Sequence, residues 1–217
     1  MSTVCAGRTD AGVHAWEQVV HFETDAVRQE RAWVYGTNTN LPADISIRWV
    51  KFVPDQFHAR FRALSRHYQY QILNRSTRPA LHRKQIAWQC RPLCVDCMQA
   101  AADYLIGEHD FSAFRASACQ AASPIRTIRY LQVTRHGEYI SVDIIANAFL
   151  HHMVRNIVGV LMAVGTGKQE PIWAKQVLAT RDRTQGAATA PAGGLYLVSV
   201  RYPEHFRIPR TAPVVAV

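Results

Sequence analysis

The sequence lacks any apolar run that approaches the roughly 20 residues needed to cross a bilayer. Its first ten residues, MSTVCAGRTD, also lack the basic head and apolar stretch of a signal peptide. We therefore expect a protein without a membrane span that acts in the cytoplasm. With 217 residues, of which 48% are hydrophobic, the chain can bury a core in one large domain or two small ones.

Cysteine is scarce, because five residues are too few for a disulfide scaffold at this length, and in the cytoplasm we expect free thiols. The three residues Cys90, Cys94 and Cys97 have the C-x3-C-x2-C spacing of the iron–sulfur motif of radical-SAM enzymes. However, Asp96 stands where such motifs usually carry an aromatic residue, and Cys94 lies where a helix is expected to begin. A zinc site would need a fourth ligand, and no spaced partner is evident. The sequence therefore disfavours an iron–sulfur enzyme, which we keep as a further alternative.

A phosphate-binding loop is also absent. Gly165-Thr-Gly-Lys168 resembles one, but Met162 replaces its first glycine and Gln169 replaces its serine or threonine. The segment also follows an expected helix rather than a strand. We therefore expect neither a metal nor a nucleotide cofactor.

Lysine occurs only four times, so arginine carries most of the formal net charge of +9. The planar guanidinium group pairs with phosphate through two hydrogen bonds and stacks on bases. A basic, arginine-rich chain suggests an anionic partner, most commonly nucleic acid. Taken alone, the charge is equally compatible with a role in solubility.

The hydrophobic pattern predicts an α+β protein with a mostly antiparallel sheet and helices packed on it. Strands are expected at 3–6 (buried), 19–22, 45–53, 65–73, on both sides of the hairpin at 135–138, and at 195–200. Helices are expected at 25–34, capped by Asp25 and stopped by Gly36, and at 98–106, 149–164 and from Pro171.

The turn Gly7-Arg8-Thr9-Asp10-Ala11-Gly12 is the most informative segment. Its two glycines permit backbone conformations that side chains forbid, and Asp10 lies between them after a strand. Arg8 can reach the same space, and a nearby arginine keeps a carboxylate ionised and able to act as a nucleophile or base. From local chemistry alone, an aspartate that bonds its own backbone in a turn is the better interpretation.

Several blocks in order change that balance. Segment 7–14, GRTDAGVH, resembles the signature of the TruA family of tRNA pseudouridine synthases. The segments FHARF (57–61), RHYQY (66–70), GEHDF (107–111), NAFLHHMVRNI (147–157) and GLYL (194–197) resemble the blocks that follow it in that family. The resemblance extends from Cys5 to about Tyr202.

This resemblance implies isomerisation of uridine to pseudouridine in the anticodon stem-loop, at tRNA positions 38 to 40. Asp10 would be the nucleophile, attacking either C6 of the base or C1′ of the ribose. Tyr68 would lie against the uracil and could help to remove the C5 proton, while Leu195 would line the uracil pocket. Arg155 would pair with Asp10, and Arg8 would assist base flipping.

The resemblance also implies tRNA as a partner, a homodimer and no cofactor. His151 and His152 have no partner motif, and we interpret them as helix positions rather than ligands. The predicted RNA-binding residues are Arg28, Phe57, His58, Arg60, Arg115, Gln120 and Arg126.

The implied architecture is the pseudouridine synthase fold, with two ferredoxin- or RRM-like halves at 1–62 and 63–217. In the family, a strand, a helix and a Gly-Trp-Gln segment precede the catalytic turn, whereas Met1 lies nine positions before Asp10. We therefore expect the first half to be incomplete, with an exposed sheet edge and exposed apolar surface. The alternative function is a truncated, catalytically inactive tRNA-binding remnant.

Overall fold

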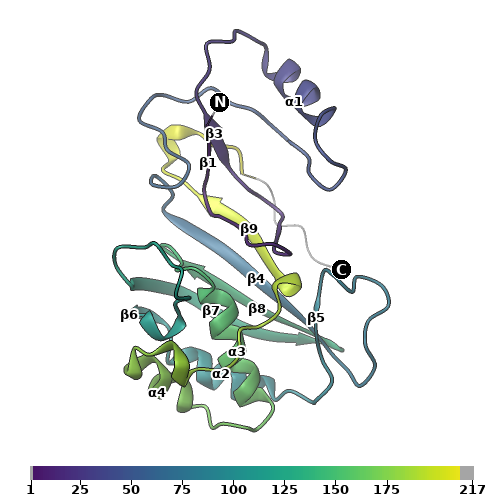
Figure 1. Cartoon of the computed structure of the whole chain (residues 1–217), viewed down its shortest axis with the longest axis vertical. Helices are drawn as coiled ribbons and strands as arrows, with labels where there is room; N and C mark the ends of the chain where they lie inside the picture. The colour runs from purple at the N-terminus through teal and green to yellow at the C-terminus, as the bar shows by residue number, and fades with distance from the viewer. Residues whose placement is uncertain (1, 211–217) are drawn as a thin grey trace.

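A mostly antiparallel sheet forms the centre of the computed structural model, which describes residues 2–210 (Figure 1). Neighbouring strands follow the order β2-β9-β4-β8-β7-β6, with β5 beside β4, and only the β2–β9 and β4–β5 pairs are parallel. This confirms the predicted α+β class. The strands are β2 (His14–Ala15), β4 (Ser65–Asn74), β5 (Ala87–Gln89), β6 (Gly107–Asp110), β7 (Ile125–His136), β8 (Tyr139–Ala146) and β9 (Leu195–Arg201).

Three helices, α2 (Val95–Asp103), α3 (Met153–Gly165) and α4 (Trp173–Thr180), lie together against one part of this sheet (Figure 1). Helix α3 is apolar almost all round, and its Ile157, Val158 and Leu161 side chains are fully buried. Burying each such side chain contributes about 1.5–3 kcal/mol. This buried helix therefore holds the loop that precedes Met153 against the core.

One face of strand β4 is buried. Arg66, Tyr68, Tyr70 and Ile72 alternate along it and are at most 8% exposed. Because successive side chains of a strand point to opposite faces, all four share one side of the sheet. The pairing of β4 with β9 shifts register between His67 and Tyr68, next to the position expected to face uracil.

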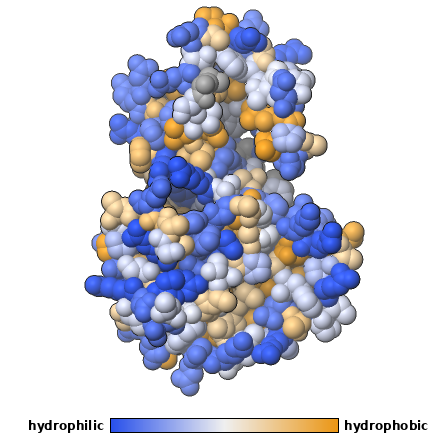
Figure 2. Space-filling model, viewed as in Figure 1, coloured by the Kyte–Doolittle hydropathy of each residue, from blue (hydrophilic) through white to orange (hydrophobic). Residues whose placement is uncertain are grey.

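A separate two-stranded sheet, β1 (Thr3–Cys5) with β3 (Val20–Phe22), lies near helix α1 (Glu30–Asn38) in the purple part of Figure 1. Figure 2 shows the molecular surface narrowing between this part and the part that carries the main sheet. Helix α1 has no buried residue. Exposed apolar surface was expected in this half, and the large exposed side chains there are Val20, Val27, Tyr35, Ile45, Phe52 and Phe61.

Several local predictions were wrong. No strand forms at 45–53, because the Asn38 side chain binds both the N–H and the C=O of Ile47 in place of a neighbouring strand. Helix α1 begins after Gln29 rather than at Asp25, and it continues through Gly36, where the helix surface is open. Strand β1 is only partly buried.

The cysteine prediction was also wrong in part. Cys94 and Cys97 form a disulfide across the first turn of α2, whereas Cys5, Cys90 and Cys119 are free. Cys94 is the N-cap of this helix, as expected from the sequence. No helix in the described range 2–210 is long and apolar enough to span a membrane. The division into halves at residue 62 stays a prediction.

Candidate active site

Asp10 lies in a short loop that is held at both ends. The backbone N–H of Val13 donates to the carbonyl of Asp10 at 3.0 Å, closing a turn in which Gly12 has a φ of 81°. On the other side, the Gln18 amide donates to the carbonyl of Gly7 at 2.6 Å. A turn with aspartate in its first position and glycine at a positive φ is what this sequence favours. The loop therefore presents the Asp10 carboxylate at a defined place.

Two histidines just before α3 and an arginine in its first turn surround that carboxylate. His151 Nε2 lies 3.1 Å from Oδ1, His152 Nε2 lies 3.0 Å from Oδ2, and Arg155 Nη1 lies 3.5 Å from Oδ2. Arg155 is fixed in turn, because its Nε donates to the carbonyl of Ala190 at 2.8 Å. An ionised carboxylate offers about four lone-pair positions, so three donors leave room for a further contact.

His152 has a partly buried side chain and an uncommon backbone conformation. Burial lowers the pKa of His152; the neighbouring His151 adds to this, and Asp10 acts in the opposite direction. His152 precedes α3 with a left-handed φ of 61°, a conformation uncommon for a residue other than glycine. The residue is thus held in a strained position from which its ring reaches Asp10.

A cleft of about 590 Å³ opens over the Asp10 carboxylate. Tyr68 and Leu195, both less than 10% exposed, form part of its wall. The Tyr68 ring meets that of Phe149 edge to face, with 5.0 Å between ring centres. Burial raises the pKa of Tyr68 to about 12, so its hydroxyl is neutral at physiological pH. The cleft therefore offers a flat aromatic and apolar wall next to a charged oxygen pair.

Arg66 ties the walls of this cleft together. It is 8% exposed, and its guanidinium donates to the carbonyls of Ala6, Arg60, Ala63 and Asn147. Those carbonyls belong to the segment before Asp10, the segment before β4 and the segment before α3. Burial lowers the pKa of Arg66. Among the described residues, no carboxylate lies within ion-pair distance of its guanidinium.

Comparison with known proteins decides the family. A family model described as tRNA pseudouridine synthase matches residues 101–203. A tRNA pseudouridine synthase A from Nitrosococcus oceani is 56% identical over 217 residues, covering 100% of this chain and 84% of the relative. Those from Alcanivorax borkumensis and Coxiella burnetii are 56% and 54% identical, covering 96% and 95% of this chain and 78% and 79% of the relatives. The chain belongs to the tRNA pseudouridine synthase A family.

The structure brings together most of the residues that the resemblance to the tRNA pseudouridine synthase A family singled out. Eight of them line the cleft: Arg8, Asp10, Arg60, Tyr68, Gln120, Arg126, Arg155 and Leu195. They come from the Asp10 loop, the segment before β4, strand β4, the segment before β7, the start of β7, helix α3 and the start of β9. Arg115 does not line the cleft but donates to the carbonyl of Cys119, which does.

Three of the predicted RNA-binding residues lie elsewhere. Phe57 is only 6% exposed and packs on Tyr202 and Phe206, so its side chain is a core residue and is unavailable to RNA. The His58 ring stacks on Phe61, which does border the cleft. Arg28 lies over the Trp33 ring near α1, outside the cleft lining.

Two features of this candidate site were not predicted from the sequence. His151 and His152 were interpreted as helix positions, but both precede α3 and bind Asp10, so that interpretation was wrong. Arg66 belongs to the segment 66–70 that resembles the family, but no role was predicted for it from the sequence. The alternation along β4 could have identified it, because this pattern places it on the same buried face as Tyr68.

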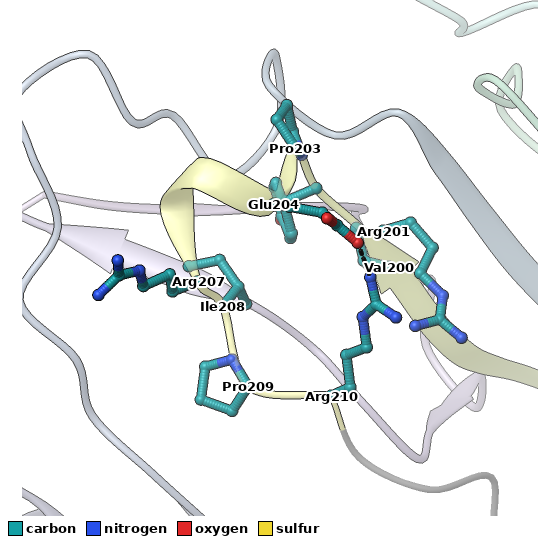
Figure 3. Close-up of a pocket in the computed structure, with 9 residues that line it drawn as sticks. Val200, Arg201, Pro203, Glu204, Arg207, Ile208, Pro209 and Arg210 are labelled. Carbon is teal, nitrogen blue, oxygen red and sulfur yellow. Dashed lines mark hydrogen bonds and ion pairs between the residues drawn. The ribbon is translucent and has the colours of Figure 1, made fainter.

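A second cavity, of about 130 Å³, lies at the end of β9 and shares no lining residue with the cleft (Figure 3). In Figure 3, Arg210 reaches across it to Glu204, with 3.0 Å between Nη2 and Oε1. That ion pair is largely exposed and contributes little to stability. Because Asp10 and its partners line the larger cleft, we assign the candidate active site to that cleft and not to this cavity.

Proposed function

We propose that the protein converts uridine to pseudouridine in the anticodon stem-loop of tRNA, at positions 38 to 40, with Asp10 as the nucleophile. The observation that carries this proposal is that Asp10, Arg155, Tyr68 and Leu195 converge on one cleft from four parts of the chain. Membership of the tRNA pseudouridine synthase A family supports the same reaction.

The reaction is an isomerisation that needs no electron donor or acceptor. Asp10 attacks C6 of the base or C1′ of the ribose, and both routes stay open. The N1–C1′ bond breaks, the uracil turns, and a C5–C1′ bond forms. C5 loses a proton and N1 gains one, so the atoms balance.

The target uridine must first leave its stack, at a cost of a few kcal/mol. The Tyr68 ring would offset part of this cost by stacking, and Leu195 would close the apolar side of the pocket. Arg155, anchored by Ala190, would hold the Asp10 carboxylate toward the base. The exposed Arg8 would hold the extruded nucleotide.

The remaining contacts would follow the tRNA outside the pocket. Arg60, Gln120 and Arg126 border the cleft and can meet phosphate oxygens. A homodimer would double the positive surface, so that one tRNA is read by its shape across both subunits. We also place the enzyme in the cytoplasm.

Incubation of the chain with tRNA tests the proposal. One substrate carries its natural anticodon-arm uridines and a matched substrate carries cytidine there, and pseudouridine is quantified by mass spectrometry alongside tRNA binding. We expect product only from the first substrate. Binding of both substrates without any product would instead support an inactive tRNA-binding protein.

A further inference from the structure

The side chains around Asp10 have the composition of a transition-metal site. One oxygen of Asp10 and one ring nitrogen each of His151 and His152 lie within 4.8 Å of one another. His151 Nε2 lies 3.1 Å from Asp10 Oδ1, and His152 Nε2 lies 3.0 Å from the other carboxylate oxygen, Oδ2. Ligands of a tetrahedral zinc ion lie about 2.1 Å from the metal, and thus about 3.4 Å from one another. Small side-chain rotations would bring all three atoms onto one ion.

We propose that Asp10, His151 and His152 bind a divalent transition-metal ion such as Zn²⁺, and that the bound ion prevents the Asp10 carboxylate from attacking uridine. The second part rests on the function proposed above. Three protein ligands leave a fourth position that faces the cleft, as in zinc sites with an open coordination position. The ion would be an inhibitor, because a carboxylate oxygen that coordinates a metal no longer has that electron pair free to attack carbon.

The ligand types decide which metals fit. Two imidazole nitrogens with one carboxylate oxygen suit Zn²⁺, Co²⁺, Ni²⁺ or Cu²⁺. Mg²⁺ and Ca²⁺ prefer oxygen ligands only and fit poorly. The three side chains are between 28% and 37% exposed, so an ion can reach them from the cleft.

The backbone that carries the histidines is held in place before any ion arrives. The N–H of His151 donates to Cys119 Sγ at 3.3 Å, and the carbonyl of His151 accepts from the N–H of Ala116 at 3.0 Å. The N–H of Asn156 donates to the carbonyl of His152 at 2.9 Å, which links His152 to the first turn of α3. A site built on anchored backbone loses little conformational freedom on binding.

Arg155 opposes the ion. Its Nη1 lies 3.5 Å from Asp10 Oδ2, and its Nε is tied to Ala190, so the positive charge stays close to the metal position. Like charges at such distances repel, most strongly where water is partly excluded. Removing this cation should therefore tighten metal binding, although it should weaken catalysis. A cluster that serves only as a hydrogen-bond network would not show this opposite pair of effects.

Titration of the metal-free, full-length chain with Co²⁺ and Zn²⁺ tests the site without tRNA. We expect one ion per chain, a visible Co²⁺ absorption typical of a tetrahedral nitrogen and oxygen site, and displacement of Co²⁺ by Zn²⁺. His151→Asn and His152→Asn should each weaken binding at least tenfold, and Arg155→Gln should tighten it several-fold. Asparagine tolerates the left-handed backbone at position 152, and circular dichroism verifies the fold of each variant. His136→Asn, at an exposed histidine ending β7, is the matched control and should bind like the wild type.

Inhibition is measured separately with tRNA. Zn²⁺ should stop pseudouridine formation at concentrations that fill the site, and a chelator should restore it. No bound ion, or unchanged affinity in both folded histidine variants, would overturn the site, and a bound ion without inhibition would overturn its blocking role. If the metal-free wild type makes no pseudouridine, the proposed function fails while the titration still decides whether the metal site exists.

Discussion

The Arg66 guanidinium donates to the carbonyl of Ala6 at 3.1 Å, although the two residues are 60 positions apart. Ala6 precedes the Asp10 loop, so this bond connects the central strand β4 to that loop. The same guanidinium donates to the carbonyl of Asn147, which precedes His151 and His152 in the chain. A single buried cation thus holds both sides of the cleft.

Replacing Arg66 by methionine should lower the free energy of unfolding by about 2–4 kcal/mol, because several buried carbonyls would lose a charged donor. Arg66→Lys should recover only part of this, since lysine lacks the planar fork. Urea denaturation measures both variants. Arg75→Met, which removes an exposed partner of Glu138, is the control and should cost at most about 1 kcal/mol. Equal stabilities for Arg66→Met and the control would show that Arg66 does not hold the cleft together.

Gly7 is needed for the close approach of Tyr68. A methyl group at position 7 would lie 3.1 Å from Tyr68 Oη, which is tighter than ordinary contact. We expect Gly7→Ala to reduce kcat/KM roughly tenfold or more, because small misplacements in an active site are costly. Gly36→Ala, where a methyl group meets nothing within 4 Å, should leave activity unchanged and stabilise α1 by up to about 1 kcal/mol. Steady-state kinetics on tRNA compare the two, and full activity in Gly7→Ala would contradict the close approach.

The buried Tyr68 hydroxyl makes stability depend on alkaline pH. Its pKa is about 12 in the folded protein, against an ordinary value of 10.0, so its contribution is complete below pH 10 and is lost as the pH rises toward 12. A difference of two pKa units corresponds to about 2–3 kcal/mol. Tyr68→Phe should therefore lose less stability between pH 10 and 12 than the wild type does. Identical pH dependence in the two proteins, measured by urea denaturation, would contradict this assignment.

Arg60 should contribute to tRNA affinity through phosphate. It is exposed at the rim of the cleft, and only its backbone carbonyl is engaged by Arg66. Arg60→Gln should weaken binding and reduce the slope of log affinity against log salt by about 1. Arg28→Gln, which removes the same charge outside the cleft lining, should change the slope less. Filter binding over a range of salt concentrations tests this, and equal slopes for the two variants would place Arg60 off the RNA path.

The long elements could be predicted from the sequence, because β4, β7, β8, β9 and α3 have clear hydrophobic periods. The strand expected at 45–53 could not be excluded, since alternation alone does not reveal that the Asn38 side chain satisfies the Ile47 backbone. The Asp10 loop was predictable from its motif. The contact of His151 with Asp10 was not, because it joins residues 141 positions apart through the approach of two loops.

Comparison of Asp10→Asn with the wild type, at tRNA concentrations that saturate both, tests most directly whether Asp10 is the nucleophile. Asparagine preserves the size of the side chain and its turn but has no anionic oxygen. We expect normal tRNA binding, with pseudouridine formation below detection in a single-turnover assay. Pseudouridine formation by Asp10→Asn at a rate near that of the wild type would show that Asp10 is not the nucleophile.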